Sequence, residues 1–580
     1  MIKRLYSCVR EYKKQVFLTL FFIVAEAVIE AWIPFITARL VNQINAGIDM
    51  PLLVRLGSLL ILLSVCSLAC GGIAGFTSAR ASAGFARNVR HDLFHKVQSY
   101  SFENIDKFSS SSLVTRMTTD VNNVQMAFMM LIRIAVRAPL MLIFSITMSY
   151  IMGGVLATTF VVMIPILGFG LLMIGRKAMP AFRSVFKKYD LLNESVEENV
   201  RGMRVVKGFA REEYEKEKFA AASDNIRFDF TKAERIVALN RPLMQLCVYF
   251  NMIFVLFLGS KIVISSHGSV INVGQISAML TYGMQVLMQL MMLSMIYVML
   301  TMSTESAKRI YEVLDEIPAI ESPENALTAV ADGSIDFEDV SFKYSRTAEQ
   351  SALRDIDLHI RSGMTVGILG STGSGKTTLV QLIPRLYDTT EGSLRIGGQD
   401  VRCYDLDALR GAVAMVLQKN ELFSGTIREN LRWGNPNATD EELVEACRLA
   451  QADGFITSFP DGYDTHIEQG GTNVSGGQKQ RLCIARALLK KPKILILDDS
   501  TSAVDTRTDA LIREGLRTYI PETTKLIIAQ RISSVQDADL ILMMENGTIS
   551  ASGTHEELLQ SCETYREIYQ QQTKGGSENE

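Results

Sequence analysis

The sequence has almost no net charge, because 59 lysines and arginines are balanced by 62 acidic residues to give −3. No basic run interrupts this balance, which argues against nucleic acid as a partner. Cysteine is also scarce, with eight residues scattered along the chain. Cys66 and Cys70 form an i, i+4 pair in an apolar run, either as a metal or redox pair or as two small helix-packing residues. Cys403, Cys447 and Cys483 lie in the more polar half and are expected to be reduced cytosolic thiols.

Apolar residues are distributed unevenly along the 580 positions, a length that predicts several domains. Up to about residue 305, long apolar stretches contain few charges, whereas the remainder has the composition of a soluble α/β protein. The first apolar run begins near Val16 and is too long for a cleavable signal peptide. A bilayer core of about 30 Å requires roughly 20 apolar residues in a helix. Six segments satisfy this length, at residues 16–41, 54–77, 131–151, 155–175, 242–264 and 274–302.

Basic residues predict the orientation of these six spans. The short loops at 42–51, 152–154 and 265–273 contain no lysine or arginine. The N-terminal segment and the two long connections are basic, with Lys3, Arg4, Arg10, Lys13, Lys14, Arg80, Arg87, Arg90, Arg176, Lys177, Arg183, Lys187 and Lys188. The six spans and these basic segments predict a multi-pass membrane protein with a defined orientation. Its N-terminus, both long connections and its C-terminal half are expected in the cytoplasm.

Each long connection is polar, has a helical pattern and must reverse direction at its tip. At 1.5 Å per residue, two helical extensions of about 25 residues would reach some 35 Å below the membrane. The expected tips are Phe102–Phe108 and Val206–Tyr214. A short helix at either tip is expected to sit in a groove of the soluble α/β domain and transmit its motion. The alternative is an ordinary solvated bend.

Four ionisable residues lie in or beside the apolar spans. Glu26 and Glu30 form one i, i+4 pair, and Arg133 and Arg137 form another, so each pair lies on one helix face. Such groups are expensive in lipid and are expected to face a cavity or one another. They either line a polar cavity or cation-binding patch, or they pair between helices and reach to the interface.

The last span carries a stripe of methionines close to helical spacing. Methionine adapts to varied apolar ligands, but such a stripe is more typical of helix packing than of a binding face. The stripe consists of Met284, Met288, Met291, Met295, Met299 and Met302.

A change of pattern follows the last span. The segment from Ser303 to about Ala331 is charged and contains two prolines, as expected for a helix leaving the membrane and a linker. From Ser334 the pattern is one of short strands and turns. We therefore predict a multidomain chain, with an all-α membrane domain of six spans and long cytoplasmic helical extensions, followed by an α/β domain of the P-loop class. The expected boundaries are 1–316 for the membrane domain, 317–332 for the linker, 333–574 for the α/β domain and 575–580 for a tail.

A glycine loop, G-S-T-G-S-G-K-T, follows the apolar strand Val366–Leu369 and precedes a helical segment at Thr378–Leu386. Strand, glycine loop and helix together form a phosphate-binding loop, whose backbone N–H groups surround phosphate oxygens. Lys376 is expected to reach the β- and γ-phosphates, and Thr377 to bind Mg²⁺. The predicted contacts with ATP are Gly370, Ser371, Thr372, Gly373, Ser374, Gly375, Lys376, Thr377 and Thr378.

A second apolar strand, Ile494–Leu497, ends at Asp498. An acidic residue in this place holds Mg²⁺ in many nucleotide hydrolases, although one Asp after an apolar run is also typical of a helix cap or turn. Its position directly before D-S-T-S-A-V-D favours the metal role.

The sequence V-S-G-G-Q, from Val474 to Gln478, resembles the signature of ATP-binding-cassette proteins. The whole chain is similar to a half-transporter of the ATP-binding-cassette exporters. This resemblance implies that Tyr344 stacks on adenine and that Gln418 contacts Mg²⁺ and the attacking water. It also implies a sandwich of two cassettes around two ATP molecules, each closed by the partner's signature. The residues implied at that interface are Ser475, Gly476, Gly477, Gln478 and Asp505.

Two residues depart from the family pattern at the chemistry itself. The family usually has glutamate where this chain has Asp499, and histidine where it has Gln530. Aspartate places its carboxylate about 1.5 Å further back, and an amide cannot shuttle a proton. A third departure lies near Gln469, where the family usually has glutamate. The resemblance is therefore to the degenerate-site subunit of bacterial heterodimeric multidrug-type exporters, with Asp499, Gln530 and Gln418 as the catalytic set.

The sequence thus predicts ATP-driven export of small amphipathic compounds by a heterodimer with a second half-transporter. In this dimer the intact signature completes the partner's ATP site. A slow homodimer and a non-transporting ATP-gated membrane subunit are the alternatives. A soluble mechanical ATPase is excluded by the six spans. The expected partners are therefore a second half-transporter, membrane lipid and a small-molecule substrate, with ATP and Mg²⁺ as cofactors.

Overall fold

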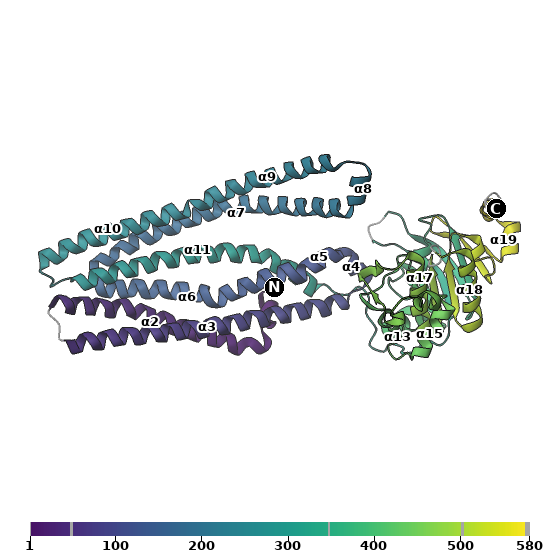
Figure 1. Cartoon of the computed structure of the whole chain (residues 1–580), viewed down its shortest axis with the longest axis horizontal. Helices are drawn as coiled ribbons and strands as arrows, with labels where there is room; N and C mark the ends of the chain where they lie inside the picture. Colours follow the sequence, from purple (N-terminus) through teal and green to yellow (C-terminus); the bar gives the residue numbers. More distant parts are fainter. Residues whose placement is uncertain (1, 47–49, 346–348, 500–503, 575–580) are drawn as a thin grey trace. The chain divides into compact units, whose positions relative to one another are not determined.

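A computed structural model describes the chain except for residues 1, 47–49, 346–348, 500–503 and 575–580, so the predicted tail lies outside the described residues. The chain forms two compact units (Figure 1). The membrane unit comprises Met1–Gln98 and Ser109–Glu316. The cassette unit comprises Ser99–Phe108 and Ile317–Glu580, so a ten-residue piece from the first long connection groups with the C-terminal half.

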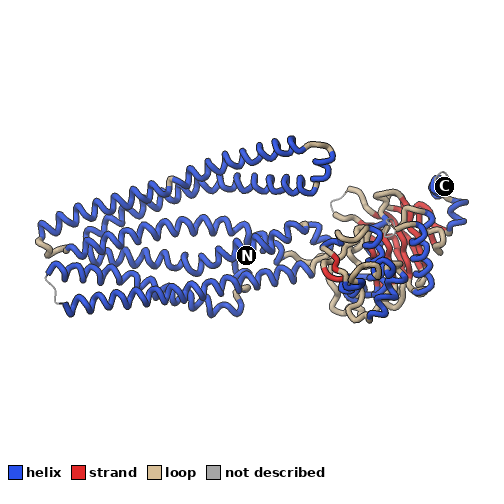
Figure 2. Tube along the Cα trace, in the orientation of Figure 1, coloured by secondary structure: helices blue, strands red, loops and turns tan. Residues whose placement is uncertain are grey.

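The described part of the membrane unit consists of helices joined by short loops (Figure 2). Within it, six helical stretches are long and apolar enough to cross a bilayer. Helices suit this setting because every interior backbone group is hydrogen bonded within its own segment. The spans lie in α2 (Lys13–Ala46), α3 (Met50–Gln98), α6 (Val121–Gly153), α7 (Thr158–Arg201), α10 (Asn240–Ser266) and α11 (Val273–Asp315). The prediction of six spans is confirmed. The fourth begins at Thr158 rather than at 155, because Gly154 has a φ of 50° and a 3-10 turn, Gly154–Ala157, follows.

The two long connections continue as helices, as predicted. Helix α3 runs on to Gln98, and α7 continues to Arg201 and packs along α9 (Glu212–Ala238). The ring of Phe182 meets that of Phe230 at 6.3 Å, and Lys188 pairs with Asp229 at 2.7 Å.

The tips of these connections differ from each other. The first tip is helix α4 (Phe102–Phe108), as expected. The second tip turns within the expected range Val206–Tyr214, but its short helix, α8 (Met203–Gly208), begins before that range. The chain turns after Gly208 because Ala210 adopts a left-handed φ of 53°, and α9 starts at Glu212.

Three of the four charged residues, Glu26, Glu30 and Arg137, pair between helices, which was one of the two predicted alternatives. The Arg137 guanidinium on α6 donates to Glu30 of α2 at 2.5 Å and lies 3.5 Å from Glu26. Arg133 lies one turn away, where a Cβ on Gly75 of α3 would be 3.8 Å from its guanidinium. The sequence favoured helix packing over a binding face for the methionine stripe of α11, and this stays a prediction. Met284, Met288, Met291, Met295 and Met302 are 38–56% exposed.

The cassette unit contains a six-stranded sheet with the order β12-β11-β3-β10-β9-β6. Its strands are β3 (Thr365–Gly370), β6 (Val413–Val416), β9 (Ile494–Asp498), β10 (Thr524–Ile528), β11 (Leu540–Glu545) and β12 (Thr548–Gly553). All neighbouring strands are parallel except β12, which is antiparallel to β11. The carboxyl ends of β3, β9 and β10 therefore lie along one edge, and ligands of parallel α/β sheets bind at that edge.

Buried apolar side chains cover both faces of this sheet. On β10, Leu526 and Ile528 belong to one core and Ile527 to the other, as the two-residue period of a strand requires. A second, antiparallel sheet has the order β2-β1-β4-β5. Its strands are β1 (Ile335–Phe342), β2 (Leu353–Ile360), β4 (Glu391–Ile396) and β5 (Gln399–Asp400). The α/β class predicted for this half is confirmed.

Helix α4 is held on the cassette by hydrogen bonds. The buried Asn104 donates its amide N–H to the carbonyl of Ile317 and accepts from the N–H of Ala319, each at 3.0 Å. The hydroxyl of Tyr387 donates to Asp106 at 2.9 Å. The first tip therefore sits on the cassette of its own chain, which was the first of the two predicted alternatives.

Candidate functional site

A cavity of about 460 Å³ opens at the carboxyl edge of β3, β9 and β10. The phosphate-binding loop, both acids at the end of β9 and the residues after β10 line it together. The lining comprises Leu369, Gly370, Ser371, Thr372, Gly373, Lys376, Thr377, Gln418, Asp498, Asp499, Ile528, Ala529, Gln530, Met543, Met544, Glu545, Ser550, Thr564 and Ile568. Residues that are far apart in sequence thus form one site, because the strands that carry them end at one edge.

The glycines of the loop are required by its backbone. Gly375 has a φ of 98° and is the N-cap of α12 (Lys376–Leu382), and Gly370 has a φ of 150°. A Cβ on Gly370 would lie 2.3 Å from the carbonyl oxygen of Met544, which no side chain tolerates. The loop therefore turns tightly and aims the N-terminus of α12 at the cavity, as phosphate binding requires.

Lys376 folds back over this loop. Its ammonium donates to the carbonyls of Gly370 at 2.9 Å and Ser371 at 2.7 Å. Burial lowers the pKa of this lysine, while the nearby charges of Asp498 and Asp499 oppose the shift. These two carbonyls bind the Lys376 ammonium at the loop. When ATP is bound, its phosphate oxygens are expected to replace them as hydrogen-bond acceptors.

Thr377 and Asp498 form a pair that fits a Mg²⁺ ion. The Thr377 hydroxyl lies 3.0 and 3.2 Å from the two carboxylate oxygens of Asp498, which is 3% exposed. Burial raises the pKa of Asp498, and the bond from Thr377 partly offsets it. Hard oxygen donors at the phosphate loop suit Mg²⁺, which is commonly held there by one or two side chains and the substrate's phosphates.

Asp499 lies beyond this pair and is held by two amides. The side-chain N–H of Gln530 donates to its Oδ2 at 2.9 Å, and that of Gln418 lies 3.3 Å from the same atom. The backbone of Asp499 is left-handed, with a φ of 48°, and its N–H donates to the carbonyl of Ile528. The structure thus brings all three predicted catalytic residues together around one carboxylate oxygen.

Tyr344 stands at the edge of the phosphate-loop helix. Its hydroxyl is 2.9 Å from that of Thr378 and donates to Gln381 at 3.3 Å, while its ring packs edge-on against Tyr387. The Tyr344 residue is 47% exposed, and stacking of its ring on adenine stays a prediction.

The signature residues lie away from this cavity. Ser475 is the N-cap of α17 (Gly476–Leu489) and forms a capping box with Gln478. Asp505 is the N-cap of α18 (Thr506–Tyr519) and accepts from the N–H of Thr508 at 2.9 Å. Neither group lines the ATP cavity of its own chain, so the structure does not bring these predicted contacts to the same ATP molecule.

One contributor was missed by sequence reasoning, namely the last helix, α20 (Glu563–Lys574). Thr564 and Ile568 line the cavity, and Gln572 is hydrogen bonded to the backbone beside Gln530. Its amphipathic pattern predicts a packed helix, but nothing in that pattern tells which part of the cassette it covers.

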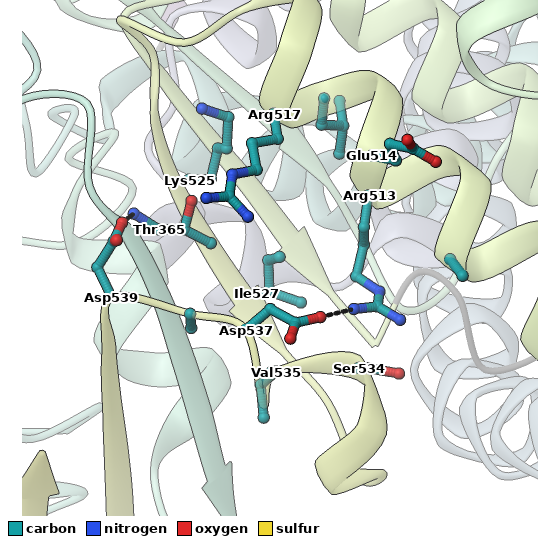
Figure 3. A pocket seen from close by; sticks show the side chains of 13 residues that line it. Thr365, Arg513, Glu514, Arg517, Lys525, Ile527, Ser534, Val535, Asp537 and Asp539 are labelled. Atoms are coloured by element: carbon teal, nitrogen blue, oxygen red, sulfur yellow. Dashed lines mark hydrogen bonds and ion pairs between the residues drawn. The ribbon is translucent and has the colours of Figure 1, made fainter. Parts of the chain in front are cut away.

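A second cavity, of about 220 Å³, lies at the opposite, amino edge of the sheet (Figure 3). Thr365 begins β3 there, and its N–H donates to Asp539 at 2.7 Å. Arg513 pairs with Asp537 at 3.3 Å. The lining of this cavity includes none of the motif residues, and its three basic side chains are balanced by three acidic ones. The cavity of about 460 Å³ is therefore the candidate ATP site.

Comparison with known proteins identifies the family of the chain. Residues 16–291 match the ABC transporter transmembrane region, and residues 353–502 match the ATPase domain family described as ABC transporter. YfiB of Bacillus subtilis (strain 168), described as an uncharacterized ABC transporter ATP-binding protein, is 37% identical over 574 residues, covering 99% of each chain. This chain belongs to the ABC transporters. As such it is a multi-pass half-transporter that hydrolyses ATP and functions as a dimer.

One further protein is similar to this ABC transporter in sequence, and one solved structure is similar to it in fold. The fatty acid ABC transporter ATP-binding/permease protein of Mycobacterium bovis (strain ATCC BAA-935 / AF2122/97) is 34% identical over 486 residues, 84% of this chain and 75% of that protein. A bacterial Atm1-family ABC exporter, solved with ATP bound, superimposes with a TM-score of 0.83 over 97% of this chain and 98% of that one. At 23% sequence identity, this superposition shows a shared fold. ATP binding and Mg²⁺ dependence belong to such ATPase domains in general.

Proposed function

We propose that this ABC transporter is one half of a heterodimeric exporter whose own ATP site is degenerate. The observation that carries the proposal is the carboxylate of Asp499, whose Oδ2 is occupied by amide groups from Gln418 and Gln530. A catalytic carboxylate must instead face the attacking water. The chain would lie in a plasma membrane with its cassette in the cytoplasm, as its basic connections indicate.

The chemistry of the two substituted positions explains why hydrolysis here is slow. Aspartate is one carbon shorter than glutamate, and a misplacement of about 1 Å can cost on the order of a hundredfold in rate. The amide of Gln530 donates a hydrogen bond but cannot take up or release a proton near neutral pH. The site therefore holds ATP and turns it over slowly.

ATP binding relies on residues that are intact. Lys376 releases the loop carbonyls and donates to the β- and γ-phosphates, and the N–H groups at the start of α12 surround the phosphate oxygens. Thr377 and Asp498 would hold Mg²⁺, which neutralises charge on the phosphates when bound. Tyr344 would stack its ring on adenine.

The second half-transporter would complete both sites. Ser475 and Gly476 are exposed at the N-terminus of α17, where they are available to the partner's ATP. Helix α8 is exposed as well, with Val205 and the following Phe209 largely uncovered. We propose that α8 docks on the partner's cassette, because Met203, Val205 and Phe209 are exposed together at this tip and a contiguous apolar patch marks an interaction surface.

For the substrate, we propose small amphipathic or hydrophobic compounds, with lipid-like molecules and peptides in the same class. The exposed methionines of α11 form an adaptable apolar face, and one relative is named for fatty acids. A slow homodimeric exporter, or an ATP-gated regulatory subunit, is the alternative.

The deciding experiment compares the chain alone with the chain plus a second half-transporter, both in nanodiscs. Mass measurement gives the oligomeric state and Mg-ATPase assays give turnover. We expect little activity alone and a strong gain with the partner. A stable homodimer with ordinary turnover would contradict the degenerate site, and strong ATPase activity without uptake of amphipathic probes into inverted vesicles would favour the regulatory alternative.

A further inference from the structure

Three consecutive glutamines, 570–572, lie near the end of the last helix, α20, and of these three Gln572 is hydrogen bonded to the loop after β10. The amide of Gln572 donates to the carbonyl of Gln530 at 2.9 Å and accepts from the N–H of Ile532 at 2.8 Å. Gln570 and Gln571 make no side-chain hydrogen bond within the described part of the chain. The side-chain amide of Gln572 thus forms hydrogen bonds with two main-chain groups of the loop that carries Gln530.

The helix that carries this amide is firmly attached to the cassette. Tyr565 of α20 is fully buried, and its hydroxyl lies 2.6 Å from Nδ1 of His555 on α19 (His555–Ser561). Burial raises the pKa of Tyr565 to about 12, so this hydroxyl stays protonated at neutral pH. Arg566 donates to the carbonyls of Leu559 and Gln560 at 2.8 and 2.9 Å. These bonds fix the direction of α20 and hence the place of Gln572.

The loop that contains these two main-chain groups follows β10, is short and ends at a buried residue. Ile528 is the last residue of β10, and Ile532 is 1% exposed at the start of the next turn. Between them, the Gln530 side chain reaches Asp499. A water molecule could replace either hydrogen bond of Gln572. A water that is not itself held in place would not fix the distance between the Gln530 carbonyl and the Ile532 N–H.

We propose that Gln572 is a positioning residue for ATP hydrolysis, acting through the main chain of Gln530. By holding the carbonyl of residue 530 and the N–H of residue 532, it sets where the side chain of residue 530 stands relative to Asp499 and the γ-phosphate. The helix also lines the cavity with Thr564 and Ile568, so α20 connects the C-terminal end of the cassette to its catalytic loop. This inference rests on the proposed function only in taking this cavity as a site of ATP hydrolysis.

Gln572 bonds to main-chain atoms of Gln530 and Ile532, so its role can be tested with any side chain at position 530. We would measure single-turnover ATP hydrolysis by the full chain in nanodiscs, in the native protein and in an Asp499→Glu/Gln530→His variant. In whichever of the two hydrolyses ATP faster, Gln572→Ala is expected to lower the rate about tenfold, consistent with a small displacement of a catalytic group. The ATP concentration for half-saturation should stay unchanged. Gln571→Ala is the matched control and should leave both quantities unchanged.

Two further variants separate positioning from a general structural role. Gln572→Glu keeps the acceptor for Ile532 but loses the donor to Gln530, so it should give an intermediate rate. In a Gln530→Ala background, Gln572→Ala should cause little further loss, because the group it positions is gone.

The proposal is overturned by equal rates for Gln572→Ala and Gln571→Ala, or by an undiminished loss in the Gln530→Ala background. A changed half-saturation together with a lower melting temperature would also overturn it, since that result indicates a structural role only. These outcomes are independent of the degenerate-site proposal, which fails instead if the native chain hydrolyses ATP as fast as the Asp499→Glu/Gln530→His variant.

Discussion

The two halves of the ATP cavity differ in how complete they are. On the phosphate side, Lys376, Thr377 and Asp498 have the residue types and contacts that nucleotide binding requires. On the hydrolytic side, a shortened carboxylate is held by two amides. The two halves come from different segments, the loop after β3 and the residues after β9 and β10. We therefore expect ATP binding and ATP hydrolysis to be separable properties of this site.

The largest effect is expected from breaking the phosphate half. Lys376→Ala should lower ATP hydrolysis by about a hundredfold or more, because it removes a charged donor to the phosphates. It should also abolish tight binding of a fluorescent ATP analogue. Lys479→Ala, which removes a lysine that also donates to a loop carbonyl, at Gly470, is the control. Retention of ATP affinity in Lys376→Ala would contradict the assignment of this loop.

Repairing the hydrolytic half should give the next largest change. The double variant Asp499→Glu/Gln530→His is expected to raise single-turnover hydrolysis at this site by more than about tenfold, because it restores reach and proton transfer. ATP affinity should hardly change. The matched control, Asp537→Glu/Gln536→His, makes the same substitutions outside the ATP cavity. Equal rates in both double variants would remove the hydrolytic explanation.

The signature sharpens the comparison, because it is expected to serve the other ATP. Ser475→Ala should lower the ATPase rate of the heterodimer about tenfold and leave nucleotide binding by the isolated chain intact. The loss of the helix cap itself costs about 1 kcal/mol of stability. Thr439→Ala removes the same kind of capping box from α15 (Asp440–Leu449) and controls for that cost. If both variants reduce activity equally, the effect is one of folding.

The smallest effect concerns the adenine contact. Tyr344→Ala should weaken ATP binding about fivefold, at the lower end of what base stacking contributes on an exposed ring. Tyr344→Phe keeps the ring, loses the hydroxyl bonds to Thr378 and Gln381, and should bind nearly as well as the native protein. Competition with a fluorescent nucleotide measures both. Equal weakening by the two variants would assign the role to the hydroxyl instead of the ring.

The sequence predicted those features that depend on local pattern. Six apolar runs gave the six spans, and the strand–glycine loop–helix pattern placed Lys376 and Thr377 at the phosphate site. The meeting of Gln418, Asp499 and Gln530 followed from the family resemblance, and a parallel sheet whose strands end at one edge explains it.

What the sequence could not predict depended on tertiary contacts. The pairing of Arg137 with Glu30, chosen among two alternatives, depends on how α2 and α6 pack. The exposure of the methionine stripe depends on which face of α11 its neighbours cover. The register of α8 was set by the left-handed turn at Ala210, a residue type that gives no such signal. The reach of Gln572 to the catalytic loop depends on the direction of α20 alone, so three identical neighbours in sequence differ in role.

The seat of α4 on the cassette has a practical consequence for dissecting this protein. A cassette cut at the predicted linker, near residue 317, would lack Asn104 and Asp106, and with them the bonds to Ile317, Ala319 and Tyr387. The excised domain would therefore expose a vacant docking surface and be a poor stand-in for the intact machine. A synthetic peptide of residues 99–108 should bind that surface in trans and raise the melting temperature of the fragment. The complete cassette unit therefore consists of two separate segments of the chain, residues 99–108 and 317–580.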